Sequence, residues 1–216
     1  MKLYKICNKI SLLLHVLASA AGYFVMEAIC RHSFIEAWNY MTQRPLVFAY
    51  NAAFIFTSSL IVYLFHRRVF WRILVTLFWL ILAIINGVLL LNRVTPFTGP
   101  DLHLITDAMK IANKYLPVAG VVAVCILFGI LVILLLMLLI KGPKYQKKIK
   151  YRYNIPLILL AVALFAGSTQ LALEKRVLSN YFGNIAFAYE DYGYPYCLAT
   201  TIFNTCLLYT SPSPRD

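Results

Sequence analysis

The chain has 216 residues, of which 62% are hydrophobic and only 13% are charged, and its mean hydropathy is +0.75. Soluble domains are about half apolar and about a quarter charged, so this composition excludes an ordinary water-soluble domain. The net charge of +12 does not indicate nucleic-acid binding, because the lysines and arginines cluster between apolar runs, as they do in the loops of membrane proteins.

Five apolar stretches are long enough to cross a bilayer, which takes about 20 helical residues. In chain order they cover residues 10–30, 45–65, 69–91, 116–140 and 155–173. We therefore expect an all-α, polytopic membrane protein in which residues 1–173 form a five-helix transmembrane bundle. Lys2, Lys5 and Lys9, followed by "LASAA", also resemble a secretory signal peptide. The apolar run continues past Ala21, which favours a retained helix.

The basic residues of the loops predict the orientation of the bundle. If the N-terminus is cytoplasmic, the inside segments hold twelve lysines and arginines and the outside segments hold seven. Cytoplasmic loops carry the excess of Lys and Arg, so we expect the N-terminus inside and the C-terminus outside. The loop "KGPKYQKKIKYRY" (141–153) supplies most of the bias, and such a loop also attracts anionic lipid.

Two outer loops are expected to contain short helices at the membrane interface. Residues 31–44 include Trp38 and Tyr40, amphipathic side chains that favour the headgroup level. Residues 98–115 begin with Thr98 and Asp101 at capping-box spacing, and apolar residues then recur at steps of three and four.

Few side chains in the spans or loops indicate chemistry. No GxSxG, Walker or GxGxxG motif is present, and none of the five cysteines forms a CxxC pair, so no catalytic or metal-ligating residue is predicted. His15 lies inside the first span, where a structural role is favoured. Glu27 and Arg31 stand four residues apart at the outer end of that span and are a candidate structural ion pair.

The segment "LNRVTPFTGPDL" (91–102) is the most distinctive outer loop. An arginine at headgroup level can bind a phospholipid phosphate through two N–H groups, so Arg93 and Asp101 are candidates for a lipid-headgroup site. The alternative is that Arg93 and Asp101 pair with each other and hold the turn.

Residues 174–205 are dense in Tyr and Phe, and Glu190 and Asp191 in their middle argue against a sixth span. We interpret this segment as an extracellular juxtamembrane linker. The final eleven residues, "CLLYTSPSPRD" (206–216), are residue for residue the translation of a transposase-type sequencing-library adaptor. We therefore expect the natural sequence to depart from the printed one after Thr205.

Two of these segments resemble the lipoteichoic acid synthase family of the sulfatase and alkaline-phosphatase-like superfamily. "RVTPFTGPDL" (93–102) resembles an Arg-x-Thr-Pro signature that ends in Asp-Leu, and "NYFGNIAFAYEDYGYPYCLATTIFNT" (180–205) resembles the stretch after the family's fifth helix. The resemblance implies a multi-pass protein of the bacterial cell membrane that anchors an extracellular phosphoglycerol transferase, acting on an anionic lipid such as phosphatidylglycerol.

In that family a threonine nucleophile and a divalent ion, usually manganese, lie in a catalytic domain after the juxtamembrane stretch. The resemblance therefore implies that this chain is a truncated fragment without catalytic residues or cofactor, and that Thr200, Thr201 and Thr205 are not the nucleophile. Two alternatives remain open. The chain could anchor a different extracytoplasmic sulfatase-like enzyme, or it could be a small complete transport or lipid-binding protein, for which Asn51, Asn86 and Gly87 within the spans are the hints.

Overall fold

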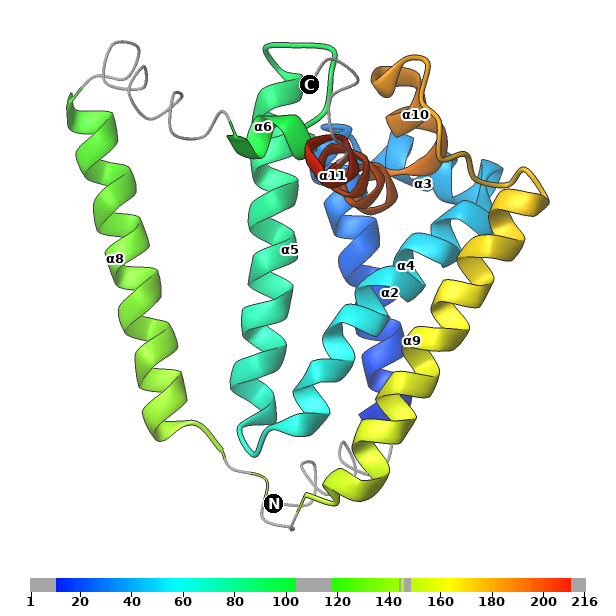
Figure 1. Ribbon diagram of the computed structural model, residues 1–216. Coiled ribbons are helices and arrows are strands. Elements are labelled where there is room, and N and C mark those ends of the chain that lie inside the picture. The colour runs from blue at the N-terminus through cyan, green and yellow to red at the C-terminus, as the bar shows by residue number, and fades with distance from the viewer. Residues whose placement is uncertain (1–10, 104–117, 144, 146–148, 211–216) are drawn as a thin grey trace.

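The computed structural model describes residues 11–103, 118–143, 145 and 149–210, and every regular element in these ranges is a helix. In chain order the elements are α2 (Ser11–Cys30), α3 (Phe34–Gln43), α4 (Pro45–Ser59), the 3-10 helix η1 (Leu60–Leu64), α5 (Arg68–Leu90), α6 (Gly99–His103), α8 (Val118–Lys141), α9 (Tyr151–Glu174), α10 (Ile185–Tyr192) and α11 (Tyr194–Thr210). The expected all-α fold is confirmed (Figure 1).

Four helical stretches among the described residues are long and apolar enough to cross a membrane: α2, α4 with η1, α5 and α9. α8 is a fifth long apolar helix, of 24 residues. Every one of these elements begins and ends within four residues of its expected range. The chain is therefore a multi-pass membrane protein whose spans follow from hydropathy alone.

Local sequence fixes where the shorter helices begin. Ser33 caps α3, because its Oγ accepts a hydrogen bond from the Glu36 amide at 3.2 Å. Asn184 caps α10 in the same way, its Oδ1 accepting from the Ala186 amide at 2.9 Å. α4 begins at Pro45, a residue tolerated in a first turn because the amides there have no helical partner.

The structure describes the first expected interfacial helix in full and the second in part. α3 occupies the 31–44 segment, with Tyr40 buried and the Trp38 side chain exposed, so one aromatic faces the protein and the other faces outward. Within 98–115, α6 covers Gly99–His103, and residues 104–115 lie outside the described part of the chain.

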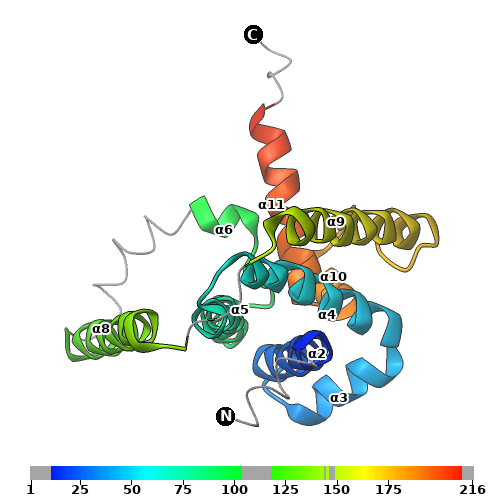
Figure 2. The ribbon, with the colours of Figure 1, turned by 90° about the horizontal axis from the view of Figure 1, so that it is seen from below.

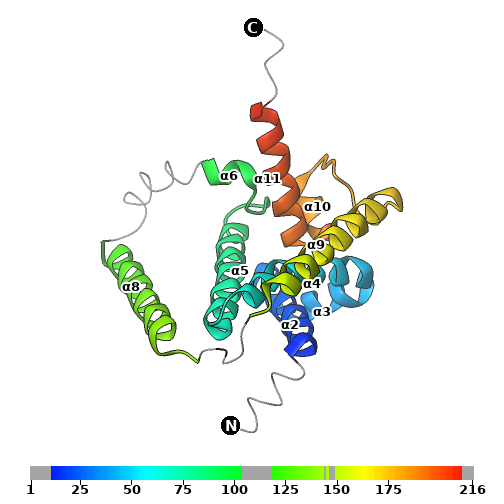
Figure 3. The ribbon, with the colours of Figure 1, turned by 60° about the horizontal axis from the view of Figure 1, so that its bottom comes forward.

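The connecting segments gather at two ends of the bundle. α3, α6 and α10 lie at one end, which we call the cap end, and the turn from α4 to α5, the end of α8 and the start of α9 lie at the opposite end (Figure 1). α11 crosses the cap end nearly perpendicular to the spanning helices (Figures 1 and 2). α8 stands apart from the other spans, beside α5 (Figure 3).

The tightly packed core lies at the cap end rather than along the middle of the spans. Residues 175–205, which we call the cap, contribute Tyr189, Tyr194 and Cys197, and these pack with Tyr23 and Cys30 of α2. By contrast, none of the residues of α9 is buried. The predicted division at residue 174 stays a prediction, but the cap is packed into the bundle and is not an extended tether.

Candidate functional site

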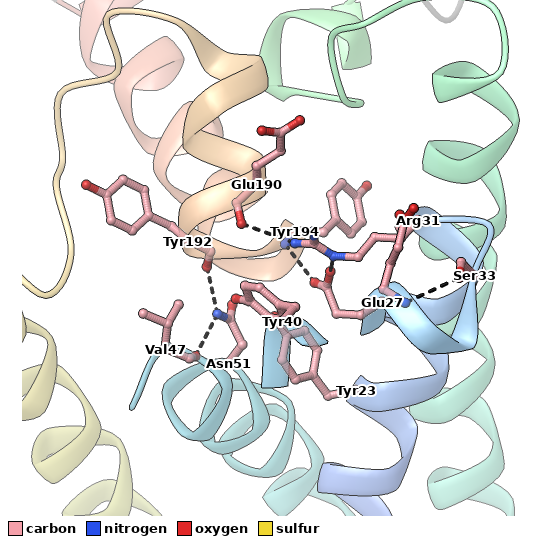
Figure 4. A network of polar contacts seen from close by, with 12 residues as sticks. Tyr23, Glu27, Arg31, Ser33, Tyr40, Val47, Asn51, Glu190, Tyr192 and Tyr194 are labelled. Atoms are coloured by element: carbon pink, nitrogen blue, oxygen red, sulfur yellow. Dashed lines mark hydrogen bonds and ion pairs between the residues drawn. The ribbon is translucent and has the colours of Figure 1, made fainter. Parts of the chain in front are cut away.

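Glu27 is a carboxylate buried within the bundle, and the cap provides part of its environment. Its side chain has no exposed surface, and it lies on the last turn of α2. Arg31 Nε donates to Glu27 Oε2 at 2.9 Å, and the amide of Tyr194 donates to Glu27 Oε1 at 3.2 Å (Figure 4). A buried charge is tolerated only when it is paired and hydrogen-bonded, so docking of the cap completes the site.

Arg31 connects this carboxylate to two more elements. Its guanidinium carbon lies 4.3 Å from the centre of the Tyr40 ring and 5.5 Å from that of Tyr189, and its Nη2 donates to the Glu190 carbonyl at 3.2 Å. Burial disfavours the charged guanidinium, but the neighbouring Glu27 outweighs burial and raises the pKa of Arg31 above its ordinary value. Arg31 therefore stays charged and holds α2, α3 and α10 together (Figure 4).

Tyrosine hydroxyls surround the pair without adding charge. Tyr23 Oη and Tyr40 Oη lie 3.2 Å apart, so one donates to the other. Burial, reinforced by the negative charge of Glu27, raises the pKa of Tyr40 and of Tyr189 well above the ordinary value. The cluster thus holds one anion, one cation and neutral phenols, an arrangement suited to fixing the cap rather than to nucleophilic chemistry.

Asn51 of α4 forms a second link to the cap. Its Nδ2 donates to the carbonyls of Val47 at 3.0 Å and Tyr192 at 2.8 Å, and its Oδ1 accepts from the Tyr196 amide at 3.0 Å. The link surrounds Gly193, whose φ of 78° favours glycine and where an added Cβ would overlap the hydroxyl of Tyr23. The close approach of α10 and α11 to α4 therefore requires a glycine at this position.

At the surface of the same end, Arg44 Nη2 lies 2.6 Å from Asp191 Oδ1. Both side chains are 45% exposed, so this pair adds little to stability compared with the buried one.

Arg93 and Asp101 are brought together, as one of the two sequence interpretations expects. The guanidinium donates to both carboxylate oxygens of Asp101, at 2.9 and 2.7 Å, and to the carbonyls of Thr95 and Pro96, at 2.9 and 3.0 Å. A guanidinium has five N–H donors, and Arg93 already makes four hydrogen bonds, so little capacity remains to bind a lipid phosphate. Burial alone would raise the pKa of Asp101, but hydrogen bonds from Arg93 and Thr98 outweigh it and lower the pKa.

This loop is fixed to the bundle and to the cap. The amide of Phe97 donates to Asn86 Oδ1 of α5 at 2.7 Å, and the amide of Gly99 donates to Thr201 Oγ1 of α11 at 3.0 Å. A Cβ added at Gly99 would lie 2.7 Å from the Thr201 carbonyl oxygen, so the loop and α11 touch through their backbones. The two segments that carry the family resemblance, about 100 positions apart, are therefore direct neighbours.

Other candidate ligands are scattered. Among the described residues, no group of three or more His, Cys, Asp or Glu side chains lies close enough to hold a metal ion. Cys30 and Cys197 are buried free thiols, and burial raises the pKa of Cys197 well above its ordinary value. His15 is buried in α2, with Nδ1 3.2 Å from the hydroxyl of Tyr63.

The four-residue spacing of Glu27 and Arg31 predicts that they are neighbours, but it does not predict their aromatic partners. Tyr23, Tyr40 and Tyr189 come from three different elements, and nothing in their spacing indicates that they meet. Polar residues within the apolar spans do indicate contacts with the outer segments. Asn51 and Asn86 are such residues, and each bonds to a segment at the cap end. No protein-family model, curated protein or solved structure matches the chain.

Proposed function

We propose that this chain is the membrane anchor of a phosphoglycerol transferase similar to the lipoteichoic acid synthases, with its cap on the extracellular side of a bacterial cell membrane. The observation that carries the proposal is the contact between the two resembling segments, through the Gly99 amide and Thr201 Oγ1 at 3.0 Å. Segments that share a family's pattern and also pack on each other are better support than either segment alone.

The packing of the cap suits the role of an anchor. A domain that follows residue 205 would leave the membrane from α11, which is held by Asn51 through the Tyr196 amide and by Glu27 through the Tyr194 amide. Fixing the exit point restricts the distance and tilt of the following domain relative to the bilayer. Such restriction lowers the entropic cost of presenting an active site to a membrane-embedded lipid.

In this proposal the chemistry belongs to the domain after residue 205. The threonine nucleophile would attack the phosphate of phosphatidylglycerol, and a manganese ion would offset charge on the phosphate oxygens. The described residues contribute position and an outer surface, with the N-terminus in the cytoplasm and the C-terminus outside, as the distribution of Lys and Arg predicts.

The alternatives have less support. A transporter would use Asn51 and Asn86 at breaks in its helices. Here α4 and α5 are continuous at both positions, and at the cap end Asn51 holds the last residue of α10 while Asn86 holds the loop that follows α5. Another extracytoplasmic sulfatase-like enzyme on the same anchor fits the same packing, so the reaction has to be established on the protein that includes the following domain.

Two experiments test the proposal. Sequencing the source gene past codon 205 by an adaptor-free method should show an open frame that encodes an extracellular domain with a threonine nucleophile and metal ligands. A stop codon immediately after codon 205 would refute it. The protein encoded by the longer gene should then transfer glycerol phosphate from phosphatidylglycerol in vesicles containing manganese, and hydrolysis of a sulfate ester alone would instead support the other sulfatase-like anchor.

For the lipid-binding alternative, Arg93→Ala is the direct variant. If Arg93 binds headgroups, the variant should lose association with phosphatidylglycerol while Asp101→Asn retains most of it. If Arg93 only holds the turn, both variants should disturb the loop, because each removes one half of the same ion pair.

A further inference from the structure

A groove of about 330 Å³ lies between α2, α4 and α5, along the part of α2 that runs from His15 to Met26. Its walls are formed mainly by apolar and small side chains, including Ala18 and Gly22 of α2, Ile55 of α4 and Trp79 of α5. All three helices belong to the membrane-spanning set, so the groove lies at the depth of the lipid chains. The Glu27 cluster and the Arg93 loop do not contribute to it.

The shape of the groove follows from how α2 and α5 pack. Near the cap they touch at Gly87, where an added Cβ would lie 3.0 Å from the Ile29 carbonyl oxygen. Toward the opposite end the two helices diverge (Figures 1 and 2). Along the divergent part Gly22 has no atom within 4 Å of the position of a Cβ, so unfilled space adjoins α2 there.

Polarity changes along the length of the groove. The end nearest the turn from α4 to α5 carries His15 and Arg72, while the end toward the cap is lined by side chains such as Met26 and Trp79. Among the described lining residues, Arg72 carries a cationic guanidinium, and no carboxylate lines the groove. A positive charge at the edge of the bilayer core favours an anion, and the rest of the groove favours hydrocarbon.

The length of the groove matches half of a bilayer. From His15 to Met26 the helix advances eleven residues, which is about 16 Å at about 1.5 Å per residue. One leaflet contributes about 15 Å of a hydrocarbon core of about 30 Å. An acyl chain inserted from one leaflet would therefore reach the cap end of the groove while its headgroup remained beside Arg72.

We propose that this groove binds one anionic phospholipid, with an acyl chain between α2 and α5 and its phosphate at Arg72. The lipid belongs to the leaflet on the side opposite the cap. It is therefore not the substrate that the proposed anchor function places near the cap, and the two proposals can fail separately.

The test uses the full chain purified in detergent and transferred to nanodiscs of phosphatidylcholine with and without phosphatidylglycerol. Lipid that remains bound after transfer back to detergent is identified by native mass spectrometry. We expect one retained phosphatidylglycerol per chain, and Arg72→Gln should lower its retention about fivefold, the factor for one cationic contact. Arg152→Gln is the matched control, because Arg152 is an exposed arginine at the same end of the bundle but does not line the groove.

Gly22→Leu tests the hydrocarbon part of the site without altering charge. The leucine side chain would occupy the space beside α2, so retention should be lost while the thermal unfolding temperature stays near that of the unaltered chain. Equal retention of phosphatidylcholine and phosphatidylglycerol, or equal effects of Arg72→Gln and Arg152→Gln, would overturn the proposal. A lipid-free dimer that cross-links through α2 would overturn it too, because the groove would then hold a second copy of the chain.

Discussion

Removing the charge of Arg31 should destabilise this protein far more than removing that of Arg44, although both arginines form ion pairs at the cap end. Glu27 has no exposed surface and the Arg31 side chain is 14% exposed, whereas Arg44 and Asp191 are each 45% exposed. Arg31→Met leaves the Glu27 carboxylate buried without its counter-ion. Breaking a buried pair lowers the free energy of unfolding by about 3–5 kcal/mol. Because Arg31 is partly exposed, we expect a loss at the lower end, about 3 kcal/mol.

The surface pair sets the comparison. Arg44→Met should change the free energy of unfolding by less than about 1 kcal/mol, because an exposed pair is screened by solvent. For a chain of this length about 3 kcal/mol corresponds to a fall of roughly 6–12 °C in the unfolding temperature. Size-exclusion chromatography after a series of heat steps in detergent measures that temperature for both variants.

A double variant separates the loss of a favourable pair from the cost of an unpaired charge. Glu27→Gln keeps an acceptor for the Tyr194 amide, which lies 3.2 Å from Glu27 Oε1. Combined with Arg31→Met, it should recover part of the stability that Arg31→Met loses, because no buried charge remains. If the double variant is less stable than Arg31→Met alone, or if Arg31→Met and Arg44→Met unfold at the same temperature, Glu27 is not a buried charge that depends on Arg31.

Three further outcomes follow from the packing at the cap end. Gly193→Ala should destabilise the packed cap by about 2 kcal/mol or more, because φ is 78° at this residue and an alanine is strained there. The buried thiol of Cys197 should then react with maleimide at pH 7 in this variant only. Gly99→Ala should separate the outer loop from α11 and increase protease cleavage of that loop, while Gly183→Ala, where an added Cβ meets nothing within 4 Å, should not. The pKa of Asp101 is lowered in the folded chain, so its contribution to stability is present above the ordinary value of 3.8 and is lost as the pH falls through the lowered pKa. Between pH 6 and pH 3 the unfolding temperature of Asp101→Asn should therefore fall less than that of the unaltered chain.

Hydropathy determined the spans because the bilayer imposes a simple rule. A helix that satisfies its own backbone hydrogen bonds and carries about 20 apolar residues is stable in lipid whatever its neighbours are. Residues 45–65 and 69–91 could therefore be assigned from composition, and α4 with η1 and α5 fall within one residue of those bounds. The pair Glu27 and Arg31 was accessible for a related reason, since residues four apart on a helix are neighbours.

The cap shows what composition could not determine. Its sequence, rich in Tyr and Phe with Glu190 and Asp191 between them, indicated only that residues 174–205 do not span the membrane. Whether such a segment leaves the bundle or folds back onto it depends on partners more than 100 positions away. Asn51 of α4 and Glu27 of α2 are those partners, and each meets an amide of the cap.

The sequence by itself thus determined that this is a multi-pass helical membrane protein, because insertion into lipid depends on each segment's own apolar surface and length. Only the tertiary structure decided where the core lies and which side chains surround Glu27. Packing inside a bilayer gains little from apolar burial and depends instead on close approach and on paired polar groups. The contacts of Asn51 with Tyr192 and of Glu27 with the Tyr194 amide join segments more than 100 positions apart, so they exist only once the chain has folded.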